Sequence, residues 1–142
     1  MTFKMQYMAL RIYKLIFFLL FLCSCKDDFE KQYTWHKIKV TATAYNSLKS
    51  QTDSNPHITA FGDSLKPGLK YIAVSNDLIK KGLKHDIPVK IHGLEGIYFV
   101  KDRMHGRWKN RIDIYMGVDV KAAKTWGRKK VSIHYGLPKE TP

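Results

Sequence analysis

The alternation of apolar and polar residues along this chain is mostly that of short β-strands. Residues 37–45 alternate between the two kinds, which is the two-residue period of a strand with one buried face. β-Branched and aromatic content predicts further strands, each bounded by Gly, Pro or Asn. The expected strands cover residues 37–45, 71–75, 88–92, 96–101, 111–115 and 130–135. Such a succession of short strands with glycine-rich connections predicts a small barrel.

Two short helices complete the expected fold. Ser75 or Asn76 can cap a helix over residues 76–83, and Asp119 can cap a second helix over residues 120–126. A chain of 142 residues supports one modest domain. We therefore expect a single, mostly β domain over residues 37–136 and a tail over residues 137–142.

The first 24 residues have the pattern of a secretory leader. Three basic residues precede the apolar run 15–22, which is shorter than the roughly 20 residues that a transmembrane helix needs. A Leu-Cys-Ser-Cys sequence ending at Cys25 follows, and it resembles the lipobox of a bacterial lipoprotein. Under this interpretation Cys25 carries a lipid, and residues 25–36 tether the domain to the cell envelope, on the periplasmic or the surface-facing side of an outer membrane. The alternatives are an ordinary signal peptide and a single-span anchor.

Cysteine content and charge narrow the class of partner. Both cysteines lie at the leader junction, so the expected domain has no disulfide framework. The chain has 25 basic and 12 acidic residues and a net charge of +13; the leader holds three of the bases and no acid, which leaves 22 bases, 12 acids and a charge of +10. For an exported protein, this charge favours anionic wall polymer or lipid over nucleic acid, or it serves solubility alone.

Two aspartates are the most informative residues of the expected domain. Asp102 follows one predicted strand, and Asp113 lies inside the next, between Ile112 and Ile114. Aspartate is depleted in strands, and a buried carboxylate has to be paired or neutralised. Stability alone therefore gives little reason for an aspartate at position 113.

The order of short motifs resembles that of the three-aspartate (3D) domain family over residues 40–135. These motifs are a strand ending in Thr-Ala-Tyr, a Thr-Ala-x-Gly turn, the eleven-residue spacing from Asp102 to Asp113, and the string Arg-Ile-Asp-Ile-Tyr-Met-Gly around Asp113. The resemblance implies a small six-stranded double-psi β-barrel with two short helices. It also implies a lytic transglycosylase that acts on the glycan strands of peptidoglycan.

The implied chemistry needs one carboxyl group as both acid and base. Lytic transglycosylases cleave the MurNAc–GlcNAc bond without water, because the muramyl 6-hydroxyl attacks the anomeric carbon and leaves a 1,6-anhydromuramyl end. The acid donates to the glycosidic oxygen and then accepts the hydroxyl proton. The resemblance assigns this role to Asp113, whose apolar neighbours favour its neutral form. Asp102 would hold a hydrogen bond to Asp113 or to the sugar.

The other implied site residues belong to the glycan-binding side of the barrel. Ser75 occupies the position of the family's first aspartate, and aromatic rings could stack on sugar faces. The expected substrate-binding residues are Tyr45, Thr59, Asp63, Ser75, Trp108, Arg111 and Tyr115. The six histidines show no metal-ligand spacing, so we expect neither a metal nor a cofactor.

Structural roles, or binding without catalysis, stay open for the same residues. Asp113 could cap a turn or pair with Arg111 or Arg107, and Asp102 could accept hydrogen bonds from loop amides. A barrel with Ser75 at an aspartate position could also bind peptidoglycan without cleaving it. In either case the expected partners are glycan strands and, through a lipid, the membrane; nucleic acid is not expected.

Overall fold

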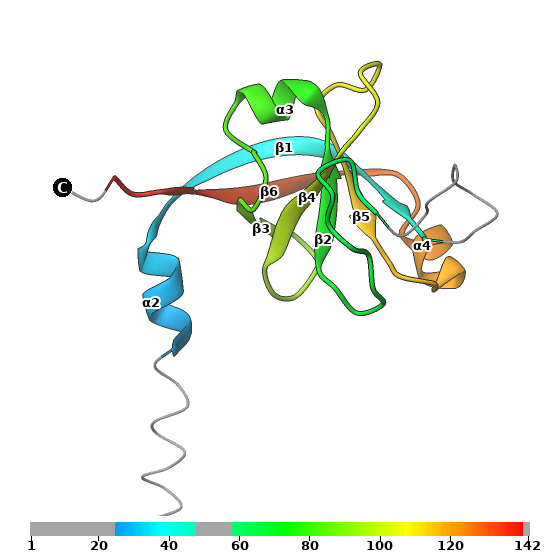
Figure 1. Ribbon diagram of the computed structural model, residues 1–142, viewed down its shortest axis with the longest axis horizontal. Helices are drawn as coiled ribbons and strands as arrows, with labels where there is room; N and C mark the ends of the chain where they lie inside the picture. The colour runs from blue at the N-terminus through cyan, green and yellow to red at the C-terminus, as the bar shows by residue number, and fades with distance from the viewer. Residues whose placement is uncertain (1–24, 48–57, 141–142) are drawn as a thin grey trace, which may run out of the picture. The chain divides into compact units, whose positions relative to one another are not determined.

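The computed structural model describes residues 25–47 and 58–140, and its six strands form one closed barrel (Figure 1). The strands are β1 (Tyr33–Tyr45), β2 (Tyr71–Val74), β3 (Pro88–Ile91), β4 (Tyr98–Arg103), β5 (Arg111–Tyr115) and β6 (Lys129–Pro138). The helices of the described residues are α2 (Cys25–Lys31), α3 (Asn76–Lys80) and α4 (Val120–Trp126). The prediction of a small, mostly β, six-stranded barrel is confirmed, with one more short helix than expected.

The chain divides into two compact units. Residues Trp35–Leu137 form the barrel unit, and the described part of the other unit contains α2 and the segment that begins at Pro138. α2 lies within the expected tether. The expected leader 1–24 and the side chain of Cys25 lie outside what the structure describes, as do the loop residues 48–57. Within the described ranges, no helix combines the length and apolar character that crossing a membrane requires.

Helix α3 is shorter than its sequence predicts, because a glycine ends it. Gly82 has φ +107°, a left-handed conformation that favours glycine. The N–H of Gly82 donates to the carbonyl of Ile79, and the N–H of Leu83 donates to the carbonyl of Leu78. These two bonds make a Schellman motif, which satisfies carbonyls at the helix end and turns the chain toward β3.

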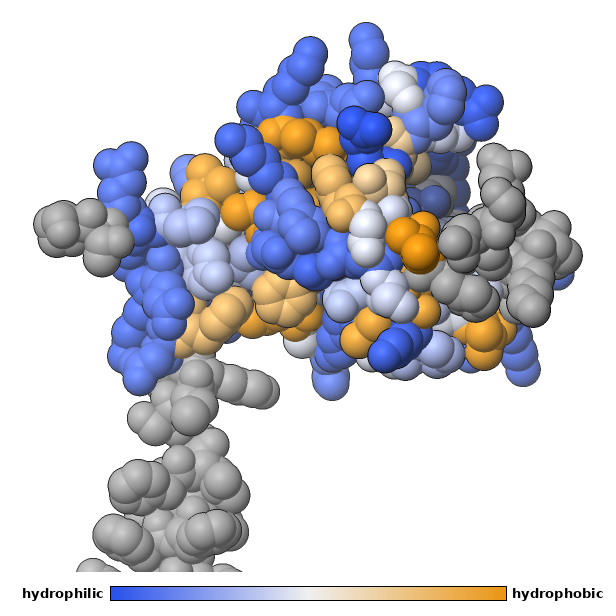
Figure 2. Space-filling view, in the orientation of Figure 1, coloured by the Kyte–Doolittle hydropathy of each residue, from blue (hydrophilic) through white to orange (hydrophobic). Residues whose placement is uncertain are grey.

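The barrel interior is filled by alternate residues of the strands. Ile112 and Ile114 of β5 are 0% and 1% exposed, and they belong to one core cluster with Val40 and Ile72. Figure 2 shows that hydrophilic residues cover most of the visible face, with smaller apolar areas between them. The large apolar side chains that stay exposed among the described residues are Ile58 and Val118.

Strand β5 lies between β1 and β2 and fixes the register of this part of the barrel. It runs parallel to β1, with Asp113 opposite Thr43, and antiparallel to β2, with Asp113 opposite Ala73. β2 in turn runs parallel to β4, where a bulge after Ile72 brings Ala73 opposite Asp102. The two aspartates therefore lie in one row across the sheet, separated only by Ala73.

The stability of the barrel should depend on the packing of β5. We expect Ile112→Ala to lower the free energy of unfolding by about 3 kcal/mol, because it leaves a cavity among fully buried side chains. Val118→Ala removes an apolar side chain that is 58% exposed, and it should change stability by less than about 0.5 kcal/mol. Urea unfolding of both variants in the detergent-solubilised full chain measures the difference; equal losses would contradict this account of the core.

Candidate functional site

The row of residues across β1, β5, β2 and β4 forms the floor of an open groove of about 200 Å³. Ala73 contributes only a methyl group between Asp113 and Asp102, which leaves space above the strands. The groove is lined by Tyr45, Ala73, Asp102, Arg103, Met104, His105, Trp108 and Asp113. The structure thus brings together four of the residues that the sequence singles out, namely Tyr45, Asp102, Trp108 and Asp113.

Asp113 is held by a hydrogen bond from the neighbouring strand. The hydroxyl of Thr43 donates to Asp113 Oδ1 over 2.8 Å. Burial raises the pKa of Asp113, and the charge of Asp102 raises it further, while Thr43 and Arg111 offset part of this rise. The neutral form of Asp113 is therefore favoured more than that of a free aspartic acid. In the described residues Asp113 makes this hydrogen bond with Thr43, and it neither caps a turn nor forms an ion pair, the two alternatives expected from sequence.

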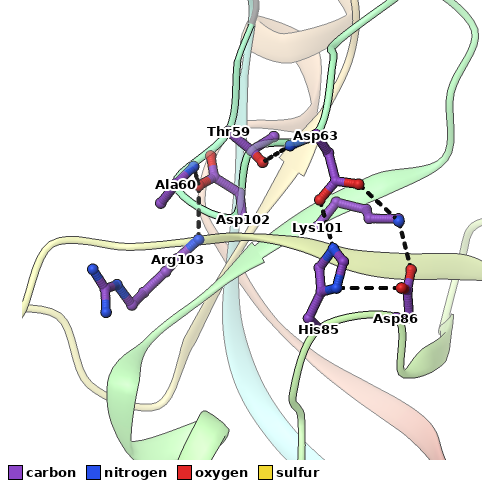
Figure 3. A network of polar contacts seen from close by, with 8 residues as sticks. All are labelled: Thr59, Ala60, Asp63, His85, Asp86, Lys101, Asp102 and Arg103. Carbon is purple, nitrogen blue, oxygen red and sulfur yellow. Dashed lines mark hydrogen bonds and ion pairs between the residues drawn. The ribbon is translucent and has the colours of Figure 1, made fainter.

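Asp102 accepts hydrogen bonds from backbone amides of loops, which is the structural role that the sequence left open for it. Its Oδ1 accepts from the N–H of Ala60 over 2.8 Å and from the N–H of Arg103 over 2.7 Å (Figure 3). Burial raises the pKa of Asp102, the two amides lower it, and the charge of Asp63 adds to the rise. The net direction is upward. Both groove carboxylates therefore bind protons more tightly than isolated aspartates do.

Tyr45 places an unused hydroxyl beside these carboxylates. This hydroxyl is buried and has no hydrogen-bond partner in the described part of the chain. Burial raises the pKa of Tyr45 well above its ordinary value, and the charges of Asp102 and Asp113 raise it further, so the group stays protonated. The ring lies 5.4 Å from that of Tyr115, whose own hydroxyl pairs with Ser47 Oγ at 2.8 Å. Tyr115 therefore supports Tyr45 from outside the groove lining.

Trp108 forms one wall of the groove and is held by arginines. The guanidinium carbon of Arg111 lies 3.9 Å from the Trp108 ring centroid, and that of Arg107 lies 4.9 Å from it. Such cation–π contacts contribute roughly 0.5–2 kcal/mol and hold the ring in place. Arg111 is buried and does not line the groove.

Thr59 and Asp63 belong to a turn that supports Asp102. The N–H of Asp63 donates to Thr59 Oγ1 over 3.0 Å, and the N–H of Thr59 donates to the carbonyl of Asp63 over 2.9 Å. The same turn supplies the Ala60 amide to Asp102. These expected substrate-binding residues therefore lie behind the groove and do not line it.

The side chain of Asp63 forms ion pairs with Lys101 and His85, as part of a larger network (Figure 3). It lies 2.9 Å from Lys101 Nζ and 2.6 Å from His85 Nε2, and both partners also contact Asp86. Burial alone would raise the pKa of Asp63, but the hydrogen bonds from Lys101 and His85 outweigh it and lower the pKa. The network anchors the supporting turn to β4 and to the segment before β3.

Ser75 is a buried structural residue in this barrel. Its Oγ accepts from the N–H of Arg111 over 3.0 Å, and its own N–H donates to the Arg111 carbonyl over 3.0 Å. Next to it, Asp77 Oδ2 accepts from the N–H of Asn110 over 2.9 Å. Ser75 and Asp77 thus hold the start of β5, and neither lines the groove.

Four lining residues were not singled out by sequence, namely Ala73, Arg103, Met104 and His105. The last three follow Asp102 directly, so the end of the predicted strand was the signal that could have found them. Thr43 was also missed, although it lies on the polar face of the expected strand 37–45. Over residues 25–47 and 58–140, no group of three metal-ligating side chains is close enough to hold an ion.

Comparison with known proteins gives a fold likeness and no family. No family model matches the chain, and no curated protein matches it. The chain is similar to a crystal structure of an apo expansin from Clavibacter michiganensis, with 19% identity, a TM-score of 0.45, and coverage of 75% of this chain and 53% of that one. A point mutant of that expansin in complex with cellohexaose matches with 17% identity, the same TM-score and the same coverage. The chain spans about half the length of either structure.

The predicted membership of the three-aspartate domain family is wrong. The chain matches no model of that family, and the similar solved structures are expansins. The prediction of a lytic transglycosylase is wrong with it, because that activity was implied by the resemblance. What remains of the site is its geometry: two hydrogen-bonded carboxylates, a free phenol and an indole around one groove.

Four carboxylates of this chain should titrate in two groups. Asp102 and Asp113 should have pKa values above that of a free aspartate, whereas the ion pairs of Asp63 and the hydrogen bonds of Asp77 should keep theirs below it. Carboxyl-carbon NMR titration of the full chain measures all four. In Asp102→Asn the pKa of Asp113 should fall, because a neighbouring negative charge is lost. An unchanged value would show that the two groups do not interact.

The same shift makes stability depend on pH in a defined direction. A carboxyl whose folded pKa exceeds its unfolded pKa destabilises the fold above the folded pKa, and this penalty disappears as the pH falls to the unfolded pKa. Asp113→Asn keeps an acceptor for Thr43 and removes the charge. It should therefore be more stable than the parent chain at pH 7, and this advantage should vanish near pH 3. Urea unfolding at both pH values measures it.

Proposed function

We propose that this chain is a non-catalytic, glycan-binding protein of the cell envelope, with the groove between Asp102, Asp113 and Trp108 as its binding site. The observation that carries the proposal is the combination of unused polar atoms at the groove. Asp102 and Asp113 each commit Oδ1 to the protein, and their Oδ2 atoms make no hydrogen bond with a described residue. Tyr45 adds a buried hydroxyl that has no hydrogen-bond partner among the described residues.

These groups are complementary to the chemistry of a sugar. Carboxylate oxygens accept from sugar hydroxyls, and a phenol can donate to a ring or hydroxyl oxygen. The Trp108 indole offers a flat apolar surface to the C–H face of a pyranose ring.

The charge of the groove favours neutral sugar units. Two adjacent carboxylates repel an anionic group, so the units in direct contact should carry hydroxyl or acetamido substituents. Arg103 and His105 at the same groove could meet a more distant acidic substituent of the polymer. Peptidoglycan strands, in which every second sugar lacks a carboxylate, satisfy this pattern. Binding requires no proton transfer from Asp113.

The proposed location follows from the N-terminal sequence. A leader that ends at Cys25, and a lipid on that residue, would place the barrel at the membrane surface beside the cell wall. The net charge of +10 after the leader would favour an anionic envelope surface. A tethered binding module also gains from a high local concentration of its polymer.

Binding to the groove can be tested with soluble oligosaccharides. Calorimetric titration of the detergent-solubilised full chain with chitohexaose and cellohexaose should show weak binding to at least one of them. Trp108→Ala should weaken that binding by about tenfold, since an aromatic contact contributes roughly 1 kcal/mol or more. Tyr45→Phe tests the free hydroxyl alone. Trp35→Ala, on the part of β1 distant from the groove, is the matched control and should bind as the parent does.

Mass spectrometry of isolated sacculi tests the absence of catalysis. The full chain should sediment with the sacculi and release no soluble muropeptides. Released fragments that disappear with Asp113→Asn would overturn the non-catalytic assignment. If Trp108→Ala and Trp35→Ala bind equally, the groove is not the glycan site.

Lipid attachment has its own test in the two cysteines. In a bacterial host, labelled palmitate should enter the parent chain and Cys23→Ala but not Cys25→Ala, because only Cys25 stands at the expected first position of the mature chain. Globomycin, which inhibits lipoprotein signal peptidase, should cause the unprocessed form to accumulate. Labelling of Cys25→Ala equal to that of the parent would contradict the proposed anchor.

A further inference from the structure

Arg111 is a buried cation without a counter-ion. It is 7% exposed, and it is the only charged residue among the described ones that is buried. Its Nε is buried and has no hydrogen-bond partner there, and no ion pair within residues 25–47 and 58–140 involves its guanidinium. A buried charge without a partner costs stability, because burial removes its hydration. Stability alone therefore does not account for an arginine at this position.

The backbone fixes the place from which this side chain leaves β5. The N–H of Arg111 donates to Ser75 Oγ over 3.0 Å, and its carbonyl accepts from the Ser75 N–H over 3.0 Å. The preceding residue, Asn110, has φ +48°, so the chain turns sharply into the strand. Since Ile112 belongs to the core, Arg111 and Asp113 lie on the opposite face of the strand, one pleat apart.

Arg111 acts on the groove through two lining residues. Its guanidinium carbon lies 3.9 Å from the ring centroid of Trp108. Its charge also lowers the pKa of Asp113, against the larger effect of burial, which raises it. Trp108 and Asp113 line the groove, whereas Arg111 does not. A ligand in the groove would therefore meet the influence of Arg111 only through these two side chains.

We propose that Arg111 is a positioning residue of the groove, which holds Trp108 as a wall and keeps Asp113 ionised while a sugar covers it. This inference rests on the proposed glycan-binding function. A sugar that covers Asp113 removes water from the carboxylate, and loss of hydration favours the protonated form. The cation of Arg111 opposes this change, and its attraction for the carboxylate grows as water leaves, because the local dielectric constant falls.

An ionised Asp113 makes the groove select ligands that donate hydrogen bonds. A carboxylate only accepts, and Asp113 Oδ1 already accepts from Thr43, so Oδ2 is left for a ligand hydroxyl. Hydrogen bonds to a charged acceptor are stronger than those between neutral groups. The matching ligand is a sugar with a free hydroxyl group next to the ring face that stacks on Trp108.

The pH dependence of binding then has a defined sign. Binding should be lost as the pH falls through the pKa of Asp113, because the protonated carboxyl is a weaker acceptor. The titratable or charged groups around Asp113 are Tyr45 from β1, Asp102 and Arg103 from β4, His105 from the connector after β4, and Arg111 and Tyr115 from β5; β2 contributes the uncharged Ala73. The charges that shift the pKa of Asp102 are those of Arg103 and Asp63, so a change at Arg111 should act on Asp113 alone.

Two substitutions separate the charge of Arg111 from its planar contact. Arg111→Met removes both and keeps a long unbranched side chain, whereas Arg111→Lys keeps the charge and loses the stacked plane. Carboxyl-carbon NMR of the ligand-free, detergent-solubilised full chain should show a higher pKa of Asp113 in Arg111→Met than in the parent. In Arg111→Lys the pKa should stay near the parent value. Lys109→Met removes an exposed charge from the same connector and should leave it unchanged.

Calorimetric titration with chitohexaose and cellohexaose measures the effect on binding. At pH 7 both Arg111 variants should bind about fivefold or more weakly than the parent, since the Trp108 ring loses its support. As the pH falls, Arg111→Met should lose binding at a higher pH than the parent, and Arg111→Lys should lose it at the pH of the parent. Lys109→Met should bind as the parent does at every pH.

Stability distinguishes this role from a merely structural one. Arg111→Met replaces a buried, unpaired charge by an apolar side chain, so it should unfold at the temperature of the parent or above it. A variant that loses stability together with binding would overturn the inference, because a structural residue behaves in that way.

The remaining outcomes separate this inference from the proposed function. If the parent chain binds neither oligosaccharide, the glycan-binding function fails, and the role of Arg111 in it fails as well. If the parent binds and Trp108→Ala weakens binding, but Arg111→Met binds as the parent does, only the inference about Arg111 is overturned. The same holds if the pKa of Asp113 is equal in the parent and in Arg111→Met.

Discussion

The position of Asp113 depends on the burial of its two neighbours. Ile112 and Ile114 are enclosed in the core, and because side chains alternate along a strand, the residue between them must face outward. A slip of β5 by one residue would bury the carboxylate and expose both isoleucines, which costs several kcal/mol. The packing of the barrel thus fixes the groove, and the same register places Asp102 one strand beyond Ala73.

Several residues around the row of Asp113, Ala73 and Asp102 hold these strands in place and do not line the groove. The turn that contains Thr59 and Asp63 delivers one amide to Asp102, and the ion pairs of Asp63 with Lys101 and His85 keep that turn in place. Ser75 secures the beginning of β5. A carboxylate with one oxygen held by the protein has a defined orientation, so its second oxygen can meet a ligand with little loss of conformational entropy.

The strands were predictable from sequence because residues 37–45 alternate between apolar and polar and the other strands are rich in β-branched and aromatic residues. The pairing of the strands and the family were not predictable. The parallel pairing of β1 with β5 joins residues 70 positions apart (Thr43 with Asp113, 113 − 43 = 70), and it leaves no local signal. The family assignment failed for a related reason. A polar residue between two core isoleucines is the pattern of any strand with one buried and one outer face. The string around Asp113 therefore reports a local environment shared by many barrels, and it does not specify a reaction.

The groove is acidic although the chain is strongly basic. It gathers hydrogen-bond acceptors from Asp102 and Asp113. Burial raises the pKa of both carboxyl groups, although Arg103 lowers that of Asp102 and Arg111 lowers that of Asp113. Net charge by itself would have suggested an anion at every surface. The row of side chains on β5, β2 and β4, and not the net charge, sets the local charge at the groove.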